Sequence, residues 1–254
     1  MQAPKSYLID MDGVLVTGER PIPGAERFIG RLQERGAKYL VLTNNSMHSQ
    51  GDLQYRFHIA GLDIPAEHFY TSAMATALFL ESQRPRSTVF VIGSAGLITA
   101  LHGAGFVLTD HEPDYFVLGD TIAYSYEQIT RAVRLVRAGA RFLATSPDTS
   151  WTAEAGIAPA TGAVARLIEA ASGIHPYYIG KPNPLMMRTA LRYLDAHSET
   201  SVMVGDRMDT DIISGMESGL ETILVLSGVT RREQVEEFAY RPQRIVETVG
   251  EIEV

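Results

Sequence analysis

Short apolar runs of strand length recur along the chain, and each is followed by small polar residues and then by a helical pattern. The first run, Tyr7–Ile9, leads into Asp10 and Asp12, and a second, Tyr39–Leu42, leads into Thr43. Continuous apolar runs of this length are typical of strands buried in a parallel sheet. Their alternation with helices predicts an α/β fold, in which chemistry gathers at the carboxyl ends of the strands.

Apolar residues spaced three and four apart predict amphipathic helices between these strands. Ala25, Phe28, Ile29 and Leu32 mark the first helix, which should end near Gly36. Further helices are expected over 73–83 with Ser72 as N-cap, after Ser125 with Ile129, Val133 and Val136 on one face, and over about 163–171.

The series is interrupted at Arg84-Pro85-Arg86, where a second set of strands and helices begins. The first pattern resumes after His175-Pro176. We therefore predict a Rossmann-like core formed by residues 1–84 and 176–254, with an α/β domain of residues 85–175 inserted into it. Within the insertion, residues 146–159 form a long loop that holds the only tryptophan, Trp151.

Composition narrows the class of protein. With 254 residues, 45% hydrophobic content and 20% charged content, the chain is typical of a globular protein of one large domain, or of a domain with an insertion. A net charge of -8 argues against binding to nucleic-acid polymers or anionic membranes. The absence of cysteine excludes thiolate chemistry, and no apolar run is long enough for a bilayer or reads as a signal peptide. A cytoplasmic protein is the expectation.

Four polar clusters each follow an apolar run. They are Asp10 with Asp12, Thr43 with Asn44, Lys181, and Asp206 with Asp211. Carboxylates as close as those of Asp10 and Asp12 repel each other unless a cation lies nearby or one of them keeps its proton. Each cluster alone is commonly a helix cap, a turn or a surface lysine, but no rule of core packing requires all four together.

Together the clusters suit phosphoryl transfer. Asp10 is the candidate nucleophile. The side chains of Asp10 and Asp206 and the backbone carbonyl of Asp12 can hold Mg²⁺, which prefers oxygen ligands. Thr43 and the backbone N–H of Asn44 can bind phosphate oxygens, and Lys181 offsets the negative charge. Asp12 is the candidate general acid and base.

These clusters resemble the four motifs of the haloacid dehalogenase-like phosphatases, and the NagD-type subgroup in particular. The matching stretches are 10–14, 42–45, 180–182 and 205–211, with further matches at 70–73, 147–148 and 226–229. The resemblance covers essentially the whole chain. It implies a Rossmann-like core with an inserted C2-type α/β cap, Mg²⁺, an aspartyl-phosphate intermediate and hydrolysis of phosphate monoesters.

The resemblance also implies roles for further residues. Asn45 joins Asn44 in substrate binding, and Asp211 lies behind the metal ligands. Relatives of this type act on small phosphorylated metabolites, here most readily a nucleoside monophosphate or a sugar phosphate, and they are often dimers, so a homodimer is a candidate assembly. Ser146 stands where many relatives have Asn, which affects contacts between the cap and the substrate.

The loop over 146–159 is the expected determinant of substrate choice. It carries Asp148, Trp151 and Glu154, which offer a flat stacking surface and two hydrogen-bond acceptors. Asp148 and Trp151 are therefore candidate substrate contacts. The alternative is that Trp151 packs into the core of the inserted domain.

Three other functions share parts of this pattern. A receiver-type signalling domain also gathers carboxylates, Thr and Lys around Mg²⁺, but it needs neither Asp12 nor a large insertion. A dinucleotide-binding dehydrogenase shares the sheet, but no G-x-G-x-x-G follows the first strand. A phosphomutase or another phosphotransferase on the same scaffold is compatible with all four motifs.

Overall fold

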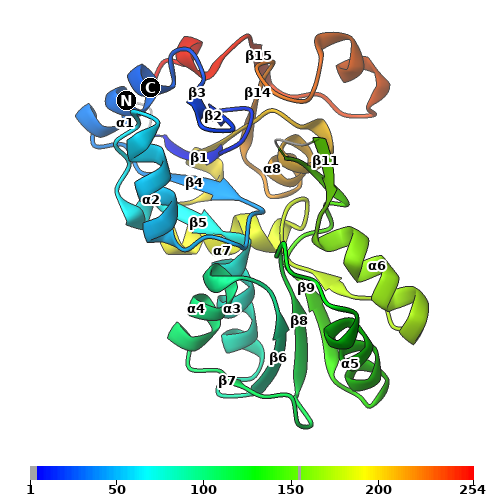
Figure 1. Cartoon of the computed structure of the whole chain (residues 1–254). Helices are drawn as coiled ribbons and strands as arrows, with labels where there is room; N and C mark the ends of the chain where they lie inside the picture. The colour runs from blue at the N-terminus through cyan, green and yellow to red at the C-terminus, as the bar shows by residue number, and fades with distance from the viewer. Residues whose placement is uncertain (1–4, 154–155) are drawn as a thin grey trace. The chain divides into compact units, whose positions relative to one another are not determined.

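The computed structural model describes residues 5–153 and 156–254, which form two compact units. The first, here called the core, comprises Met1–Thr43, Gln50–Tyr70 and Lys181–Val254. The second, here called the inserted unit, comprises Asn44–Ser49 and Thr71–Gly180. Both are α/β structures built on a parallel sheet, as the sequence predicts (Figure 1).

The core sheet has six strands in the order β15-β14-β13-β1-β4-β5. The pairs from β15 to β4 are parallel. The two predicted apolar runs are its central strands β1 and β4, and every residue in both is buried. The bounds are β1 Ser6–Asp10, β4 Tyr39–Thr43, β5 Phe69–Thr71, β13 Ser201–Gly205, β14 Glu221–Val225 and β15 Arg244–Val246.

Helices cover both faces of the core sheet. On one face, α1 (Ala25–Glu34) and α2 (Gln50–Ile59) pack against alternate residues of the central strands, such as Ile9 and Val41. On the other, α7 (Pro184–Leu194) contacts β4, and α8 (Ile213–Glu217) contacts β14 (Figure 1). This layering leaves the strand ends as the place where polar side chains from several segments can meet.

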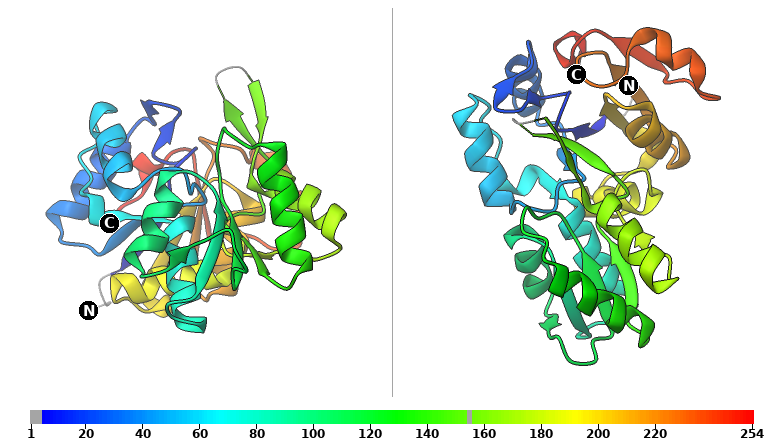
Figure 2. Two further views of the ribbon diagram at one scale, coloured as in Figure 1. Left: turned by 60° about the horizontal axis from the view of Figure 1, so that its bottom comes forward. Right: turned by 45° about the vertical axis from the view of Figure 1, so that its right-hand side comes forward.

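The inserted unit has its own five-stranded parallel sheet, in the order β12-β9-β8-β6-β7. Helices α5 and α6 lie side by side against one face of this sheet (Figure 2), around the stacked rings of Phe116 and Phe142. The bounds are α3 Ser72–Gln83, β6 Thr88–Ile92, α4 Ala95–Gly103, β7 Val107–Leu108, β8 Tyr115–Leu118, α5 Tyr126–Arg137, β9 Arg141–Ala144, α6 Thr161–Ser172 and β12 Tyr177–Tyr178.

Of the two predicted helix caps, one is confirmed and the other is wrong. Ser125 caps α5 in a capping box with Gln128, as predicted. The prediction of Ser72 as the cap of α3 is wrong by one residue, because Thr71 Oγ1 accepts the hydrogen bond from Met74 N at 3.2 Å. The Ser72 hydroxyl instead donates to the carbonyl of Asn44 at 2.6 Å.

The prediction of one long loop over 146–159 is also wrong. The strands β10 (Ser150–Ala153) and β11 (Gly156–Pro159) pair antiparallel, with Trp151 opposite Ala158. Aromatic and β-branched residues favour this extended pairing, which the surrounding Gly, Pro and Ala conceal in the sequence. Glu154 lies outside the described residues.

The boundaries of the two units differ from the domain limits drawn from the sequence, 1–84 with 176–254 and 85–175. Helix α3 belongs to the inserted unit, and β12 pairs with β9 in the second sheet rather than joining the core. Residues 44–49 also group with the inserted unit, although they directly follow β4.

The remaining elements are short. The strands β2 (Val16–Thr17) and β3 (Arg20–Pro21) form a hairpin, and a π-helical turn, Met208–Ile212, precedes α8. Single 3₁₀ turns occupy Ala66–His68, Ser198–Thr200 and Val249–Glu251, and a 3₁₀ helix of six residues occupies Arg232–Glu237. Within the described residues, no helix has both the length and the apolar character needed to cross a bilayer.

Candidate active site

Two carboxylates meet at the carboxyl ends of neighbouring core strands. Asp10 is the last residue of β1, and Asp206 follows the last residue of β13. Because β1 and β13 are paired in parallel with Ile9 opposite Val204, both acids emerge at the same edge of the sheet. Asp10 is 8% exposed and Asp206 is 2% exposed. The structure therefore places two predicted site residues together in a nearly buried position.

Lys181 lies between carboxylates. Its Nζ donates to Asp10 Oδ1 and to Asp211 Oδ1, the latter at 2.7 Å, and the lysine is only 3% exposed. The other oxygen of Asp211 accepts from the backbone N–H of Arg207 at 3.1 Å. Asp211, fully buried, thus holds Lys181 in position while its own two oxygens are engaged.

The charges in this cluster do not balance. Burial raises the pKa of Asp10 well above its usual range; Lys181 acts against this, while Asp211 and Asp206 add to it. Burial, followed by the negative charge of Asp211, raises the pKa of Asp206 to about 7. Burial by itself lowers the pKa of Lys181, but the carboxylates of Asp10 and Asp211 outweigh it and the net change is upward. Three carboxylates lie near one ammonium group, so a further positive charge would be stabilised in this cluster.

The donor set fits a divalent cation. Oxygens of Asp10, Asp206 and Asp211 lie within 4.8 Å of one another. Within residues 5–153 and 156–254, the buried Asp206 Oδ1 has no hydrogen-bond partner, whereas Oδ2 accepts from Val229 N at 2.6 Å. A hard cation such as Mg²⁺ takes carboxylate oxygens of this kind. Since Asp211 is already engaged, Asp10 and Asp206 are the side chains best placed to hold it.

Two glycines make space around Asp206. A Cβ on Gly228 would lie 2.6 Å from Asp206 Cβ, and one on Gly13 would lie 2.7 Å from Asp206 Cγ. Gly13 also has a φ of 82°, in the region that favours glycine. These positions let the backbone pass close to the carboxylate, as a site that encloses a small ion requires.

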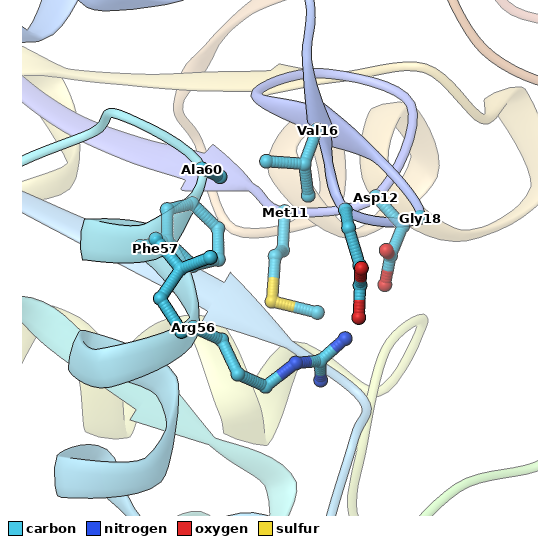
Figure 3. Close-up of a pocket in the computed structure, with 9 residues that line it drawn as sticks. Met11, Asp12, Val16, Gly18, Arg56, Phe57 and Ala60 are labelled. Carbon is cyan, nitrogen blue, oxygen red and sulfur yellow. The ribbon is translucent and has the colours of Figure 1, made fainter.

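Asp12 occupies a different setting from Asp10. It is exposed, yet the surrounding protein raises the pKa of its carboxyl by desolvation, with Arg56 and then Lys181 acting in the opposite direction. In Figure 3 the guanidinium of Arg56, from α2, points toward the Asp12 carboxylate. The pocket beside Asp12 is lined by Met11, Val16, Gly18, Glu19, Arg56, Phe57, Ile59 and Ala60.

Thr43 ends β4, the strand on the other side of β1. It is 3% exposed, and its neighbour Leu42 lies opposite Asp10 in the strand register. Thr43 is therefore placed at the same sheet edge as Asp10. The next two residues belong to the inserted unit: Asn45 Oδ1 accepts from Met47 N and His48 N, at 3.0 and 3.2 Å, and so shapes the loop.

Asp148 and Asn44 contact each other within the inserted unit. Asn44 Nδ2 donates to Asp148 Oδ2 at 2.8 Å, and the same oxygen accepts from Ser146 Oγ at 2.6 Å. Trp151, on β10, is 46% exposed. The alternative in which Trp151 packs into the core of the inserted unit is therefore wrong. Substrate contact by Asp148, Trp151 or Asn45 stays a prediction.

Comparisons with known proteins decide the family. The profile of the haloacid dehalogenase-like hydrolases matches residues 7–107, and a HAD-hydrolase-like profile matches residues 178–252. The chain is 51% identical over 247 residues to a dihydroxyacetone phosphatase of Corynebacterium glutamicum (strain R), covering 97% of this chain and 90% of the relative. This chain belongs to the haloacid dehalogenase-like hydrolase family.

Further relatives narrow the assignment within these HAD-like hydrolases. The ribonucleotide monophosphatase NagD of Escherichia coli K12 is 43% identical over 250 residues, which cover 98% of each chain. The solved structure of NagD from E. coli K-12 matches with a TM-score of 0.95 at 42% identity, over 99% of both chains. The protein is a phosphatase of the NagD type, as the motifs predict.

Reasoning from the sequence missed two residues of this HAD-like hydrolase that lie beside site residues. Arg56 belongs to no motif. In the helical pattern it stands next to the buried Phe57, and only this spacing could have indicated that Arg56 is exposed. Asp120 contacts Ser46 from 74 residues away in the chain. No local pattern reports such a long-range contact.

Proposed function

We propose that this HAD-like phosphatase hydrolyses phosphate monoesters of small metabolites through an aspartyl-phosphate on Asp10, with Mg²⁺ as cofactor. The observation that supports it is the buried carboxylate of Asp10, held by Lys181 beside Asp206, whose Oδ1 lacks a partner among the described residues. A nucleophile needs this kind of fixed orientation, and a dianionic substrate needs positive charge at the same place.

In the first step, a carboxylate oxygen of Asp10 forms a bond to phosphorus and the bond from phosphorus to the ester oxygen breaks. The electron pair of that bond goes to the leaving oxygen, which takes a proton from Asp12. In the second step, Asp12 takes a proton from water, the water oxygen bonds to phosphorus, and the bond to Asp10 breaks. Inorganic phosphate leaves and both acids return to their starting states.

The other motif residues bind the phosphate and the metal. Thr43 and Asn44 bind phosphate oxygens, and Lys181 offsets their charge. Asp10 and Asp206 would hold Mg²⁺ with the backbone carbonyl of Asp12, while Asp211 keeps Lys181 in place. Mg²⁺, when bound there, would supply positive charge that offsets the repulsion between the Asp10 carboxylate and the phosphate.

The leaving group sets the substrate class. Relatives named for dihydroxyacetone phosphate and for ribonucleotide monophosphates differ in this part of the substrate. We take nucleoside monophosphates and sugar phosphates, trioses included, as the candidate substrates. Residues 85–175 act as the cap in this proposal, with Asp148 and Trp151 contacting the leaving group.

The proposal is tested by phosphate release from a panel of monoesters, which includes UMP, a hexose phosphate, dihydroxyacetone phosphate, glycerol phosphate and p-nitrophenyl phosphate, ranked by kcat/KM. Steady release with Mg²⁺, lost in Asp10→Asn, is the expected result. Near-normal release by Asp10→Asn would contradict the proposed nucleophile. Transfer of the phosphoryl group to a sugar acceptor instead of water would identify a phosphomutase or phosphotransferase.

A further inference from the structure

Residues 44–49 follow β4 of the core directly, yet they group with the inserted unit. Asp120, which follows β8, makes one set of the hydrogen bonds that hold them there. Asp120 Oδ2 accepts from the backbone N–H of Ser46 at 3.3 Å and from its hydroxyl at 3.1 Å. The backbone N–H of Asp120 donates back to Ser46 Oγ at 2.8 Å. Ser46 has no exposed surface.

The second carboxylate oxygen of Asp120 is also engaged. Oδ1 accepts from the hydroxyl and the backbone N–H of Thr161, the first residue of α6. Thr145 Oγ1 adds a hydrogen bond to Ser46 Oγ at 3.1 Å. Among the described residues, every partner of the carboxylate is an N–H or O–H donor, so a side chain with two acceptor oxygens suits the position. An amide at residue 120 would turn an NH₂ group toward one of these donors.

The inserted unit holds the loop at other points along its length. Asn44 Nδ2 donates to Asp148, and the Asn44 carbonyl accepts from Ser72 Oγ. Farther on, Gly96 N donates to the carbonyl of Met47 at 2.9 Å, and a Cβ on Gly96 would lie 2.5 Å from the carbonyl oxygen of His48. The whole stretch is therefore shaped by the inserted unit, beginning one residue after Thr43.

We infer that Asp120 is a positioning residue for phosphate binding: through Ser46 it holds the loop 44–49 in the shape that lets Asn44 reach the phosphate beside Thr43. This inference rests on the proposed function, in which Asn44 binds phosphate oxygens. The inserted unit then determines affinity for the phosphate group that all substrates share, in addition to the choice of leaving group.

Inorganic phosphate is the appropriate probe, because it is the product and carries no leaving group. We expect Asp120→Asn to raise the inhibition constant of phosphate about tenfold, the loss expected for a charge-assisted hydrogen bond that orders a binding loop. Asp120→Glu, which keeps the carboxylate, should recover part of the affinity. KM should rise more than kcat falls, since Asp10 and Asp12 are untouched.

A matched control lies in the same unit. Asp114 accepts from the backbone N–H and the hydroxyl of Thr88, each at 3.0 Å, and thus repeats the arrangement of Asp120 with Thr161 away from the loop. Asp114→Asn should lower the melting temperature by a similar amount and leave the inhibition constant of phosphate unchanged. Equal effects of the two variants on phosphate inhibition would overturn the inference.

Two more variants separate the possible failures. Ser46→Ala removes the hydroxyl that joins Asp120 and Thr145, and it replaces Asp120→Asn if that variant does not fold. Ser46→Ala should also raise the inhibition constant of phosphate. An unchanged inhibition constant would overturn the inference. Thr43→Ala, which removes a hydroxyl proposed to bind the phosphate directly, tests the proposed phosphate site alone. If Thr43→Ala weakens phosphate inhibition and Asp120→Asn does not, the positioning role is wrong. If Thr43→Ala has no effect, the proposed phosphate site at the end of β4 is wrong, and the positioning role with it.

Discussion

Lys181 explains how three acids share a nearly buried site. Its ammonium contacts Asp10 and Asp211, while Asp206 relies on a single backbone donor for Oδ2. Truncating one partner of a buried ion pair leaves the other charge uncompensated, which costs roughly 3–5 kcal/mol. These contacts give each acid a different role: Asp211 holds Lys181, Lys181 orients Asp10, and Asp206 Oδ1 is available for the proposed metal.

Replacement of Asp12 by alanine should slow turnover about 10²–10⁴-fold, the usual contribution of a general acid and base. The turnover rate should fall more for esters with poor leaving groups than for p-nitrophenyl phosphate, since p-nitrophenolate leaves with little protonation. Steady-state rates on both kinds of ester check this. Glu19→Ala, which changes another acid in the same pocket, is the control and should leave the ratio of the rates on the two kinds of ester unchanged. An equal loss on both esters would remove Asp12 from this role.

Gly228→Ala should weaken metal binding, because its Cβ would overlap the side chain of Asp206. Overpacking of this kind costs roughly 1–3 kcal/mol, and here the strain falls on the carboxylate itself. Titration of Mg²⁺ by calorimetry should show a raised dissociation constant. Gly30→Ala, with nothing within 4 Å of the new methyl group, should bind Mg²⁺ as the wild type does. Wild-type affinity in Gly228→Ala would contradict the placement of the metal at Asp206.

At the scale of elements, strands and long helices could be predicted because their signals are local. The buried runs in β1 and β4 are continuous in the sequence, and the polar residues that follow them mark the sheet edge. The hairpin of β10 and β11 could not be predicted in this way, because its strands of four residues contain Ala, Gly and Pro. The sequence does not distinguish Thr71 from Ser72 as the cap of α3, because both hydroxyls can accept from the first turn of a helix.

The hairpin should govern substrate choice through Trp151, which is exposed on β10. Trp151→Ala should lower kcat/KM for the best natural substrate by roughly 1–3 kcal/mol of transition-state binding and leave p-nitrophenyl phosphate nearly unaffected. Tyr126→Ala, which removes an exposed aromatic ring from α5, is the matched control. If Trp151→Ala lowers kcat/KM equally for both substrates, or lowers only the melting temperature, the hairpin does not select substrates.

Asp148→Ala should behave differently from Trp151→Ala. Its carboxylate accepts from Asn44 Nδ2, so the substitution removes a partner of a proposed phosphate-binding residue as well as a candidate substrate contact. We expect kcat/KM to fall for p-nitrophenyl phosphate, and to fall further for natural substrates. A loss confined to natural substrates, measured on the same panel, would show that Asp148 acts on the leaving group alone.

At the scale of the whole molecule, the chain passes between the two units more often than the sequence indicates. The break at Arg84-Pro85-Arg86 is visible in composition, but residues 44–49 leave the core forty residues earlier. Their place is set by contacts with Asp120 and Gly96, distant in sequence, that no local pattern carries. The core motifs could be found from the sequence because each follows its own apolar run. Their connection to the inserted unit could not.

Mg²⁺ should stabilise the folded protein as well as support turnover. A ligand that binds only the folded state adds about 2.7 kcal/mol at a concentration of 100 Kd, which a thermal melt resolves. The gain should disappear with EDTA and in Asp206→Asn, and persist in Asp209→Asn, whose exposed acid pairs with Arg207. Ca²⁺ should inhibit turnover, because it prefers more ligands at longer distances. Full activity after exhaustive chelation would contradict the metal assignment.

The central claim, a covalent intermediate on Asp10, is tested most directly by borohydride trapping. An acyl phosphate is reduced by borohydride and a free carboxylate is not, so enzyme quenched during turnover should carry homoserine at position 10. Peptide mass spectrometry locates the change, and enzyme treated without substrate is the control. We predict homoserine at residue 10 and at no other acid. Reduction at another carboxylate, or none under conditions where phosphate is being released, would contradict the mechanism.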